Sequence, residues 1–278
     1  MMKRVGLGLL AVLGWGSWTV HGSESHGPWE KAGVEVGVFF SRLQSSVRYG
    51  SGIGVDLDPE ELFGLKAQET VFRTNAFWRF TDNRRHRADL MWFSFRRDAN
   101  RIVTEDFDLP DRNGDLIPVV AGTEVQSSFD VDIYETSYSY SFFQDDRFDL
   151  AARVGLYTMP IQSEVKASGY SDTQSSFKFI APLPVIGYRL DMMLTPKWAV
   201  RTGTQFFYFK YQSFEGSLVQ AQGAVEYKVF KNTALGLGVD SFNFNLSATN
   251  TDYPGVDLSG SVGFQYTGLH LYARWAFD

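Results

Sequence analysis

The chain of 278 residues contains no cysteine, which excludes disulfide bonds and thiolate metal sites. Only four histidines are present, so few general bases are available for hydrolytic chemistry. After residue 22 no segment approaches the run of about 18 apolar residues that marks a membrane-spanning helix. If the mature chain crosses a bilayer, it must do so as a closed β-barrel, because only that form pairs every backbone group without water.

The first 22 residues have the features of a secretory signal peptide. Two cations precede an apolar stretch of about 14 residues from Val5 to Trp18, and small residues follow at the spacing of a cleavage site. The stretch is shorter than the roughly 20 residues of a spanning helix, which argues against an uncleaved anchor. The expected organisation is a cleaved signal peptide over residues 1–22, an exposed N-terminal tail over 23–31 and a folded domain over 32–278.

The composition disfavours nucleic acid as a partner and favours a membrane wall. With a formal net charge of −6, the chain is a poor ligand for nucleic acid, and we expect no such partner. Aromatic residues make up 16% of the chain, yet its mean hydropathy is only −0.18, so apolar residues are spread thinly. A barrel wall has this composition because each lipid-facing residue is followed by one that faces the lumen.

Apolar and polar residues alternate with a period of two in many segments. Val200, Phe206 and Tyr208 share one face of a predicted strand, whereas Arg201 and Gln205 lie on the other. The same split recurs in eight further segments, with aromatic residues concentrated toward the strand ends. A water-soluble sandwich could show one or two such strands, but the repetition indicates lipid on the apolar side.

The lengths of the connectors predict the topology. The connectors at residues 81–86, 144–147, 195–197 and 230–232 are short, and the segments around 44–69, 98–128 and 159–182 are long. Short turns of outer-membrane barrels face the periplasm and long loops face outward. Up-strands are therefore expected to begin near residues 33, 87, 148, 199 and 233, and down-strands near residues 70, 129, 183, 217 and 256.

The predicted fold is an all-β, antiparallel transmembrane β-barrel of about ten strands. The apolar phase slips between Tyr266 and Leu269, so ten strands require a β-bulge at Thr267 and Gly268. A tight hairpin there would instead give twelve strands, provided that a further strand lies in the first long segment.

Several segments resemble a family of small proteobacterial outer-membrane β-barrel proteins. The resemblance is carried by residues 56–65, 78–80, 128–134 and 181–187 and by Arg84, His86 and Arg87. It spans nearly the whole mature chain and implies the barrel fold and an outer-membrane location, but no activity. The basic residues of the turn also have a plain reading as a solvated membrane edge, where cations snorkel.

The C-terminus resembles the assembly signal of outer-membrane barrels, in which alternating apolar residues end in an aromatic residue. Here the alternating residues are Leu269, Leu271, Ala273, Trp275 and Phe277. We expect Phe277 to be the residue that the barrel-assembly machinery engages, although Asp278 follows it.

A positioned catalytic base is missing from the predicted external loops. Lipid-acting or proteolytic barrels need a histidine with a serine or acidic partner at one membrane face. His21 leaves with the signal, His26 lies in the tail, His86 is placed in a periplasmic turn and His270 in the last strand. We therefore assign no catalytic residue and expect no cofactor; an enzyme acting on lipid A or phospholipid is the alternative.

One acidic loop has a weak resemblance to a calcium site. Asp111, Asn113 and Asp115 have the alternating spacing that opens an EF-hand loop, but Gly114 is misplaced and no glutamate closes the loop. The turn propensity of Asn113 and Gly114 favours a hairpin tip instead. The loop is also acidic enough for divalent cations to bridge it to lipopolysaccharide phosphates.

The inward faces of the predicted strands carry nearly balanced charges. They are Glu35, Arg73, Arg79, Asp89, Glu135, Arg153, Arg189, Asp191, Arg201, Glu226, Lys228 and Asp240. A ring of about ten strands encloses little more than its own side chains, so these charges must pair. The sequence therefore predicts a bacterial outer-membrane barrel whose lumen is plugged by salt bridges, with a structural, surface-interaction or narrow-channel role. The expected partners are outer-membrane lipids, lipopolysaccharide and the assembly machinery.

Overall fold

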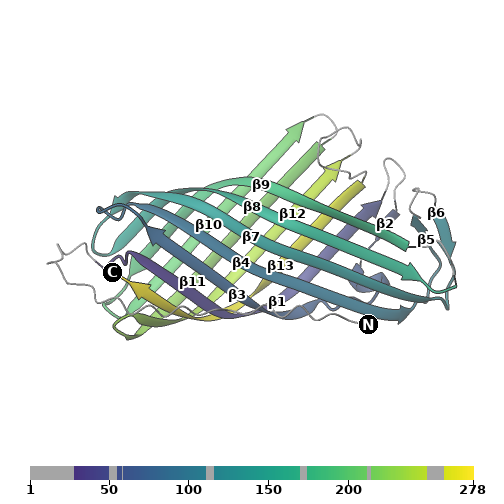
Figure 1. The fold of residues 1–278 in the computed structure, drawn as a ribbon, viewed down its shortest axis with the longest axis horizontal. Coiled ribbons are helices and arrows are strands. Elements are labelled where there is room, and N and C mark those ends of the chain that lie inside the picture. Colours follow the sequence, from purple (N-terminus) through teal and green to yellow (C-terminus); the bar gives the residue numbers. More distant parts are fainter. Residues whose placement is uncertain are drawn as a thin grey trace, which may run out of the picture.

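The computed structural model describes residues 28–49, 55–57, 59–110, 116–169, 174–211, 214–248 and 260–278. Most of these residues lie in ten antiparallel strands that close into one ring, because the last strand pairs with the first (Figure 1). The predicted all-β barrel with ten strands is confirmed, and the alternative of twelve is wrong. No helix among the described residues is both long enough and apolar enough to cross a membrane.

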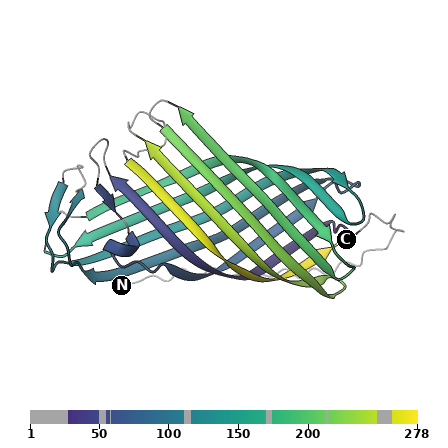
Figure 2. The same cartoon turned by 180° about the vertical axis from the view of Figure 1, so that it is seen from behind.

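The ring follows chain order around the barrel. Its strands are β1 (Ala32–Tyr49), β3 (Gln68–Arg79), β4 (His86–Ile102), β7 (Glu124–Gln144), β8 (Phe148–Ala167), β9 (Gln174–Met193), β10 (Trp198–Tyr211), β11 (Phe214–Phe230), β12 (Thr233–Ala248) and β13 (Gly260–Phe277). The short strand β2 (Val55–Leu57), the helix α1 (Pro59–Leu62) and the hairpin of β5 (Phe107–Pro110) and β6 (Leu116–Val119) lie at the end opposite the C-terminus (Figures 1 and 2).

The strands are longer than the alternation of the sequence predicts. β7, β8 and β9 contain 21, 20 and 20 residues, whereas about 9–11 residues of a tilted strand cross a bilayer. Most of the long loop expected at 159–182 is instead strand, because β8 and β9 pair without interruption from Phe148↔Met192 to Lys166↔Gln174. The ring therefore extends well beyond the thickness of a membrane.

β13 contains no bulge, which corrects the expectation at Thr267 and Gly268. Its register with β12 and with β1 is continuous through both residues. Tyr266 is buried inside the ring, whereas Leu269 on the opposite face is half exposed on the outer wall. The apolar residues change face while the backbone keeps its phase, so a slip of pattern in the sequence is not a slip of the strand.

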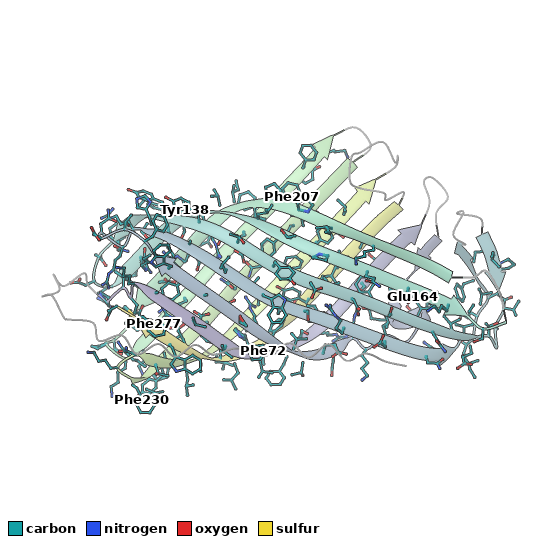
Figure 3. All side chains as sticks on the ribbon, viewed as in Figure 1. Phe72, Tyr138, Glu164, Phe207, Phe230 and Phe277 are labelled. Atoms are coloured by element: carbon teal, nitrogen blue, oxygen red, sulfur yellow. The ribbon has the colours of Figure 1, made fainter. Side chains whose placement is uncertain are left out.

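The same change of face divides the whole barrel into two halves. In β12 the outward residues Leu235 and Leu237 are apolar and Asn243 is polar, while the inward residues change from Asp240 to Phe242. We call the part with an apolar wall and a charged interior the membrane half, and the part with a polar wall and an apolar interior the outer half. Figure 3 shows Phe72, Tyr138 and Phe230 on the outer wall of the membrane half.

A cluster of aromatic side chains fills the interior of the outer half. This aromatic core consists of Phe39, Phe93, Phe95, Phe129, Phe242, Phe264 and Tyr266, none of which is more than 1% exposed. The rings of Phe242 and Tyr266 stack at 5.0 Å, and Phe39 meets Tyr266 edge to face at 5.4 Å. Leu65, which follows α1, belongs to the same cluster. A wall that faces water places its apolar side chains inside the ring, which accounts for the apolar interior of the outer half.

Candidate functional site

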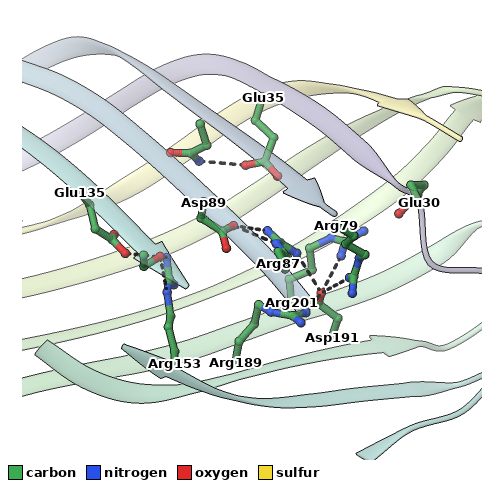
Figure 4. Close-up of polar contacts among 12 residues, drawn as sticks. Glu30, Glu35, Arg79, Arg87, Asp89, Glu135, Arg153, Arg189, Asp191 and Arg201 are labelled. Carbon is green, nitrogen blue, oxygen red and sulfur yellow. Dashed lines mark hydrogen bonds and ion pairs between the residues drawn. The ribbon is translucent and has the colours of Figure 1, made fainter. Parts of the chain in front are cut away.

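The interior of the membrane half is the candidate site, and most of the predicted lumen charges meet there (Figure 4). Those on the inward face are Glu35, Arg73, Arg79, Asp89, Glu135, Arg153, Arg189, Asp191, Arg201, Glu226 and Asp240. Lys228 differs, because it is exposed at the end of the barrel, where the register of β11 with β12 shifts after that residue. We refer to the inward charges and their partners as the charged chamber.

The layer of the chamber next to the aromatic core is held by two ion pairs. Arg73 Nη1 lies 2.5 Å from Asp240 Oδ2, and Arg153 Nη2 lies 2.5 Å from Glu135 Oε1. The Arg73 guanidinium also lies 5.2 Å from the centroid of the Phe93 ring, so its cation contacts an aromatic face. The pair of Arg73 and Asp240 therefore joins the charged chamber to the aromatic core.

Asp191 is the most crowded carboxylate of the chamber. Its Oδ2 atom pairs with Arg87 at 3.5 Å, Arg201 at 3.1 Å, Arg79 at 3.8 Å and Arg189. Asp149 shares this cationic load, since its Oδ2 atom lies 2.7 Å from Arg79 and 3.0 Å from Arg189. Several guanidinium groups in a buried space are tolerated only when carboxylates compensate them, and the two aspartates provide that compensation.

The layer nearest the C-terminal end is organised around Glu226. Its carboxylate accepts hydrogen bonds from Tyr272 at 2.8 Å and Arg274 at 2.9 Å, and it pairs with Arg201 at 2.7 Å. Arg274 also pairs with Glu35 at 3.6 Å, which links β13 to β1 inside the ring. Arg201 pairs with both Asp191 and Glu226, so the ion pairs around these two carboxylates form one network.

Three charged strand residues of this network were not among the predicted lumen charges. Arg87 was assigned to a basic turn, but it faces inward and pairs with Asp89 at 2.5 Å. Asp149 and Arg274 have the inward parity of their strands, and both are at most 2% exposed. The alternation of inward and outward residues, continued to the ends of the strands, places all three on the inward face.

Part of the predicted exposed tail also belongs to the chamber. Trp29 is only 2% exposed, and its indole nitrogen donates a hydrogen bond to the Asp145 carbonyl at 2.7 Å. Glu30 pairs with Arg274 at 3.1 Å. The exposure predicted for the tail is therefore wrong at Trp29. This side chain covers the C-terminal end of the barrel interior, where its large apolar surface is buried.

Little free space is left between the charged side chains. A cavity of about 100 Å³ is lined by Arg73, Asp89, Glu135, Asp191 and Asp240, among others. Buried polar cavities of this size commonly hold a few water molecules that complete the hydrogen bonds of their lining. This cavity is therefore of a size to hold water molecules or a small ion.

Both described histidines lie in the membrane half. His86 begins β4 on the outer wall, with Nδ1 2.7 Å from the Tyr138 hydroxyl, and His270 stacks on Tyr272 inside the ring at 4.7 Å. The metal candidates Asp111, Asn113 and Asp115 lie outside the described residues. Among the residues that are described, no group of three or more histidine, cysteine or acidic side chains could hold a metal ion.

Comparison with known proteins identifies the class of fold. No protein-family model matches the chain, and no curated protein matches it. The outer-membrane protease OmpT of Escherichia coli is similar with a TM-score of 0.54 and 9% identity over 89% of this chain and 97% of that one. The Pseudomonas putida toluene transporter TodX (TM-score 0.35, 8% identity, 89% and 91% covered) and Ail, the attachment invasion locus protein of Yersinia pestis (0.33, 9%, 87% and 98%), are more distant.

The similarity to OmpT shows a shared fold and nothing about activity, because the identity is only 9%. The chain therefore has the architecture of outer-membrane β-barrel proteins, as its alternating sequence predicts.

Proposed function

We propose that this chain is an integral outer-membrane β-barrel that conducts no ions, and that its structural or surface-interaction role is carried by its outward surfaces. The observation that carries this proposal is the aromatic core, whose side chains are buried within the outer half. A continuous water path is required for ion flow, and closely packed apolar side chains leave none.

The ion pairs of the charged chamber are a second observation that supports the same proposal. Each of its arginines has at least one carboxylate oxygen within 3.1 Å, so the charged groups contact one another where a pore would place water. The sequence-based idea of a plug made of salt bridges thus becomes a plug with two layers, one ionic and one aromatic. α1 adds to the closure, since Glu60 accepts a hydrogen bond from the buried Arg97.

Planar-bilayer recording of the purified barrel tests the proposal. We expect the wild-type protein to be silent, and the combined variant Phe39→Ala/Phe93→Ala/Tyr266→Ala to leak because it removes three of the seven side chains of the aromatic core. Phe72→Ala is the matched control, since this residue is 54% exposed on the outer wall and its loss should leave the barrel silent. Heat-modifiable migration in gels verifies that each variant is folded.

Steady single-channel conductance from the wild-type protein would refute the closed barrel and favour the narrow charged pore instead. Silence of a folded triple variant would also count against it, because the aromatic core would then not be the barrier.

A further inference from the structure

The outer wall formed by β1, β13 and β12 changes from apolar to cationic to uncharged polar within three rows of residues. The first row is the upper edge of the lipid-facing belt, where Phe40, Leu269 and Val239 are paired in register. These side chains are 50%, 51% and 57% exposed, so they offer an apolar surface to acyl chains.

The next row places a cation at the edge of that surface. Arg42 is paired in register with Thr267, which is paired with Ser241 in β12. Arg42 is exposed, and within the described part of the chain it forms no ion pair. An exposed guanidinium at the boundary of the lipid zone is available to the phosphate of an anionic lipid.

Uncharged hydrogen-bonding side chains occupy the two rows beyond Arg42. Gln44, Gln265 and Asn243 form one row, and Asn245 lies in the next on the other side of Gly263 from β1. A groove of about 220 Å³ runs between them. Gly263 keeps the groove open, because a Cβ atom there would collide with the hydroxyl of Ser46 on β1.

The remaining outer wall of this half is different in charge. Three of its exposed cations are paired with acids: Arg96 with Asp132 at 2.7 Å, Lys166 with Glu164 at 2.7 Å and Lys210 with Glu215 at 2.8 Å. A fourth, Lys178 on β9, is exposed beside Gln162 and has no ion pair among the described residues, but the groove of about 400 Å³ on this side is lined by charged residues such as Asp98 and Glu164. The wall of β1, β13 and β12 therefore combines an unpaired cation with an uncharged groove, and the other strands do not repeat this combination among their described residues.

We propose that this wall binds one lipopolysaccharide molecule, with acyl chains against Phe40 and Leu269, a lipid A phosphate on Arg42 and core sugars in the groove. The inference rests on the proposed outer-membrane location. Amide side chains donate and accept hydrogen bonds as sugar hydroxyls do, and an Arg can bind phosphate in bidentate fashion. The order of apolar, cationic and uncharged polar surfaces matches the order of chemical groups along lipopolysaccharide.

Titration of the full-length protein in detergent with purified lipopolysaccharide, lipid A and phosphatidylglycerol tests this site. Arg42→Ala should weaken binding of lipopolysaccharide and lipid A by about tenfold or more, the factor that corresponds to one charge-assisted hydrogen bond. Asn243→Ala/Gln265→Ala should weaken lipopolysaccharide by about fivefold through lost neutral hydrogen bonds and leave lipid A unchanged. Arg96→Ala, which removes the same charge from the acid-paired wall, should change neither.

Equal effects of Arg42→Ala and Arg96→Ala would overturn the site, as would phosphatidylglycerol binding as tightly as lipopolysaccharide through Arg42. An amide variant that leaves lipopolysaccharide affinity intact would overturn the placement of the sugars. Since the bilayer recording contains no lipopolysaccharide, a silent barrel that fails to bind it would remove this inference and retain the closed barrel.

Discussion

The replacement Arg73→Met measures how strongly the buried pairs stabilise the membrane half. Arg73 and Asp240 are 3% and 2% exposed and 2.5 Å apart. They come from β3 and β12, which are not neighbours in the ring, so their bond crosses the interior. Methionine keeps much of the side-chain volume but leaves the carboxylate of Asp240 buried without its cation.

Breaking one partner of such a buried pair costs about 3–5 kcal/mol, and we expect Arg73→Met to lower the free energy of unfolding by that amount. Adding Asp240→Leu should restore most of the loss, because replacing both ions by apolar groups is often neutral. In the control Lys210→Met, the broken pair is 61% and 42% exposed, and we expect a much smaller loss because water already solvates both charges.

Reversible urea unfolding in phospholipid vesicles, followed by tryptophan fluorescence, gives these free energies. The reasoning would be refuted if Arg73→Met cost no more than Lys210→Met. It would also fail if the double variant were as unstable as Arg73→Met, since the loss would then come from packing and not from an unpaired charge.

Three further outcomes are expected. Trp29→Ala should lower the free energy of unfolding by about 3–5 kcal/mol in the same assay, because it removes a buried indole and its hydrogen bond; a loss below about 1 kcal/mol would contradict the covering role of this residue. Backbone N–H groups of Arg147 and Phe148 lower the pKa of the Asp145 carboxyl in its turn. This carboxyl therefore contributes stability above its unfolded pKa and loses it as pH falls through the folded pKa, so Asp145→Asn should unfold with a shallower acid dependence below about pH 5; identical pH profiles would contradict it. Phe277→Ala should reduce the amount of heat-modifiable barrel in the outer membrane more than Phe80→Ala, an exposed aromatic at the same end; equal yields would contradict its role in assembly.

Alternation in the sequence predicts the ring and the faces of the membrane half because lipid and lumen impose opposite preferences on successive residues. Arg201 and Glu226 could be placed inside for this reason, and the structure pairs them at 2.7 Å. The partner of Arg73 could not be predicted, since Asp240 lies on a strand that is not its neighbour. Which cation meets which acid depends on how the strands are staggered around the closed ring, and a linear pattern does not contain that stagger.

The outer parts of β4, β8 and β9 fall in segments that the sequence predicts to be long loops, because the apolar residues there point inward. An alternating pattern identifies an apolar face, but it does not say whether lipid or other side chains cover that face. In β7 the inward Phe129 and Val131 are buried in the core, whereas the outward Tyr134 belongs to the wall. The apparent slip of phase in the sequence therefore marks a change of environment.

That change of environment occurs on both faces of β12. On the outside of β12 the apolar residues end at Val239 and polar residues begin at Ser241, while on its inside the charges end at Asp240 and the aromatic residues begin at Phe242. Both transitions fall at the same height because a wall in lipid buries apolar groups on its outer face and can keep a polar interior, whereas a wall in water must bury them inside. Arg42 lies at this height on β1, and its position at the boundary, next to the apolar Phe40 row, is what makes it available to a lipid phosphate.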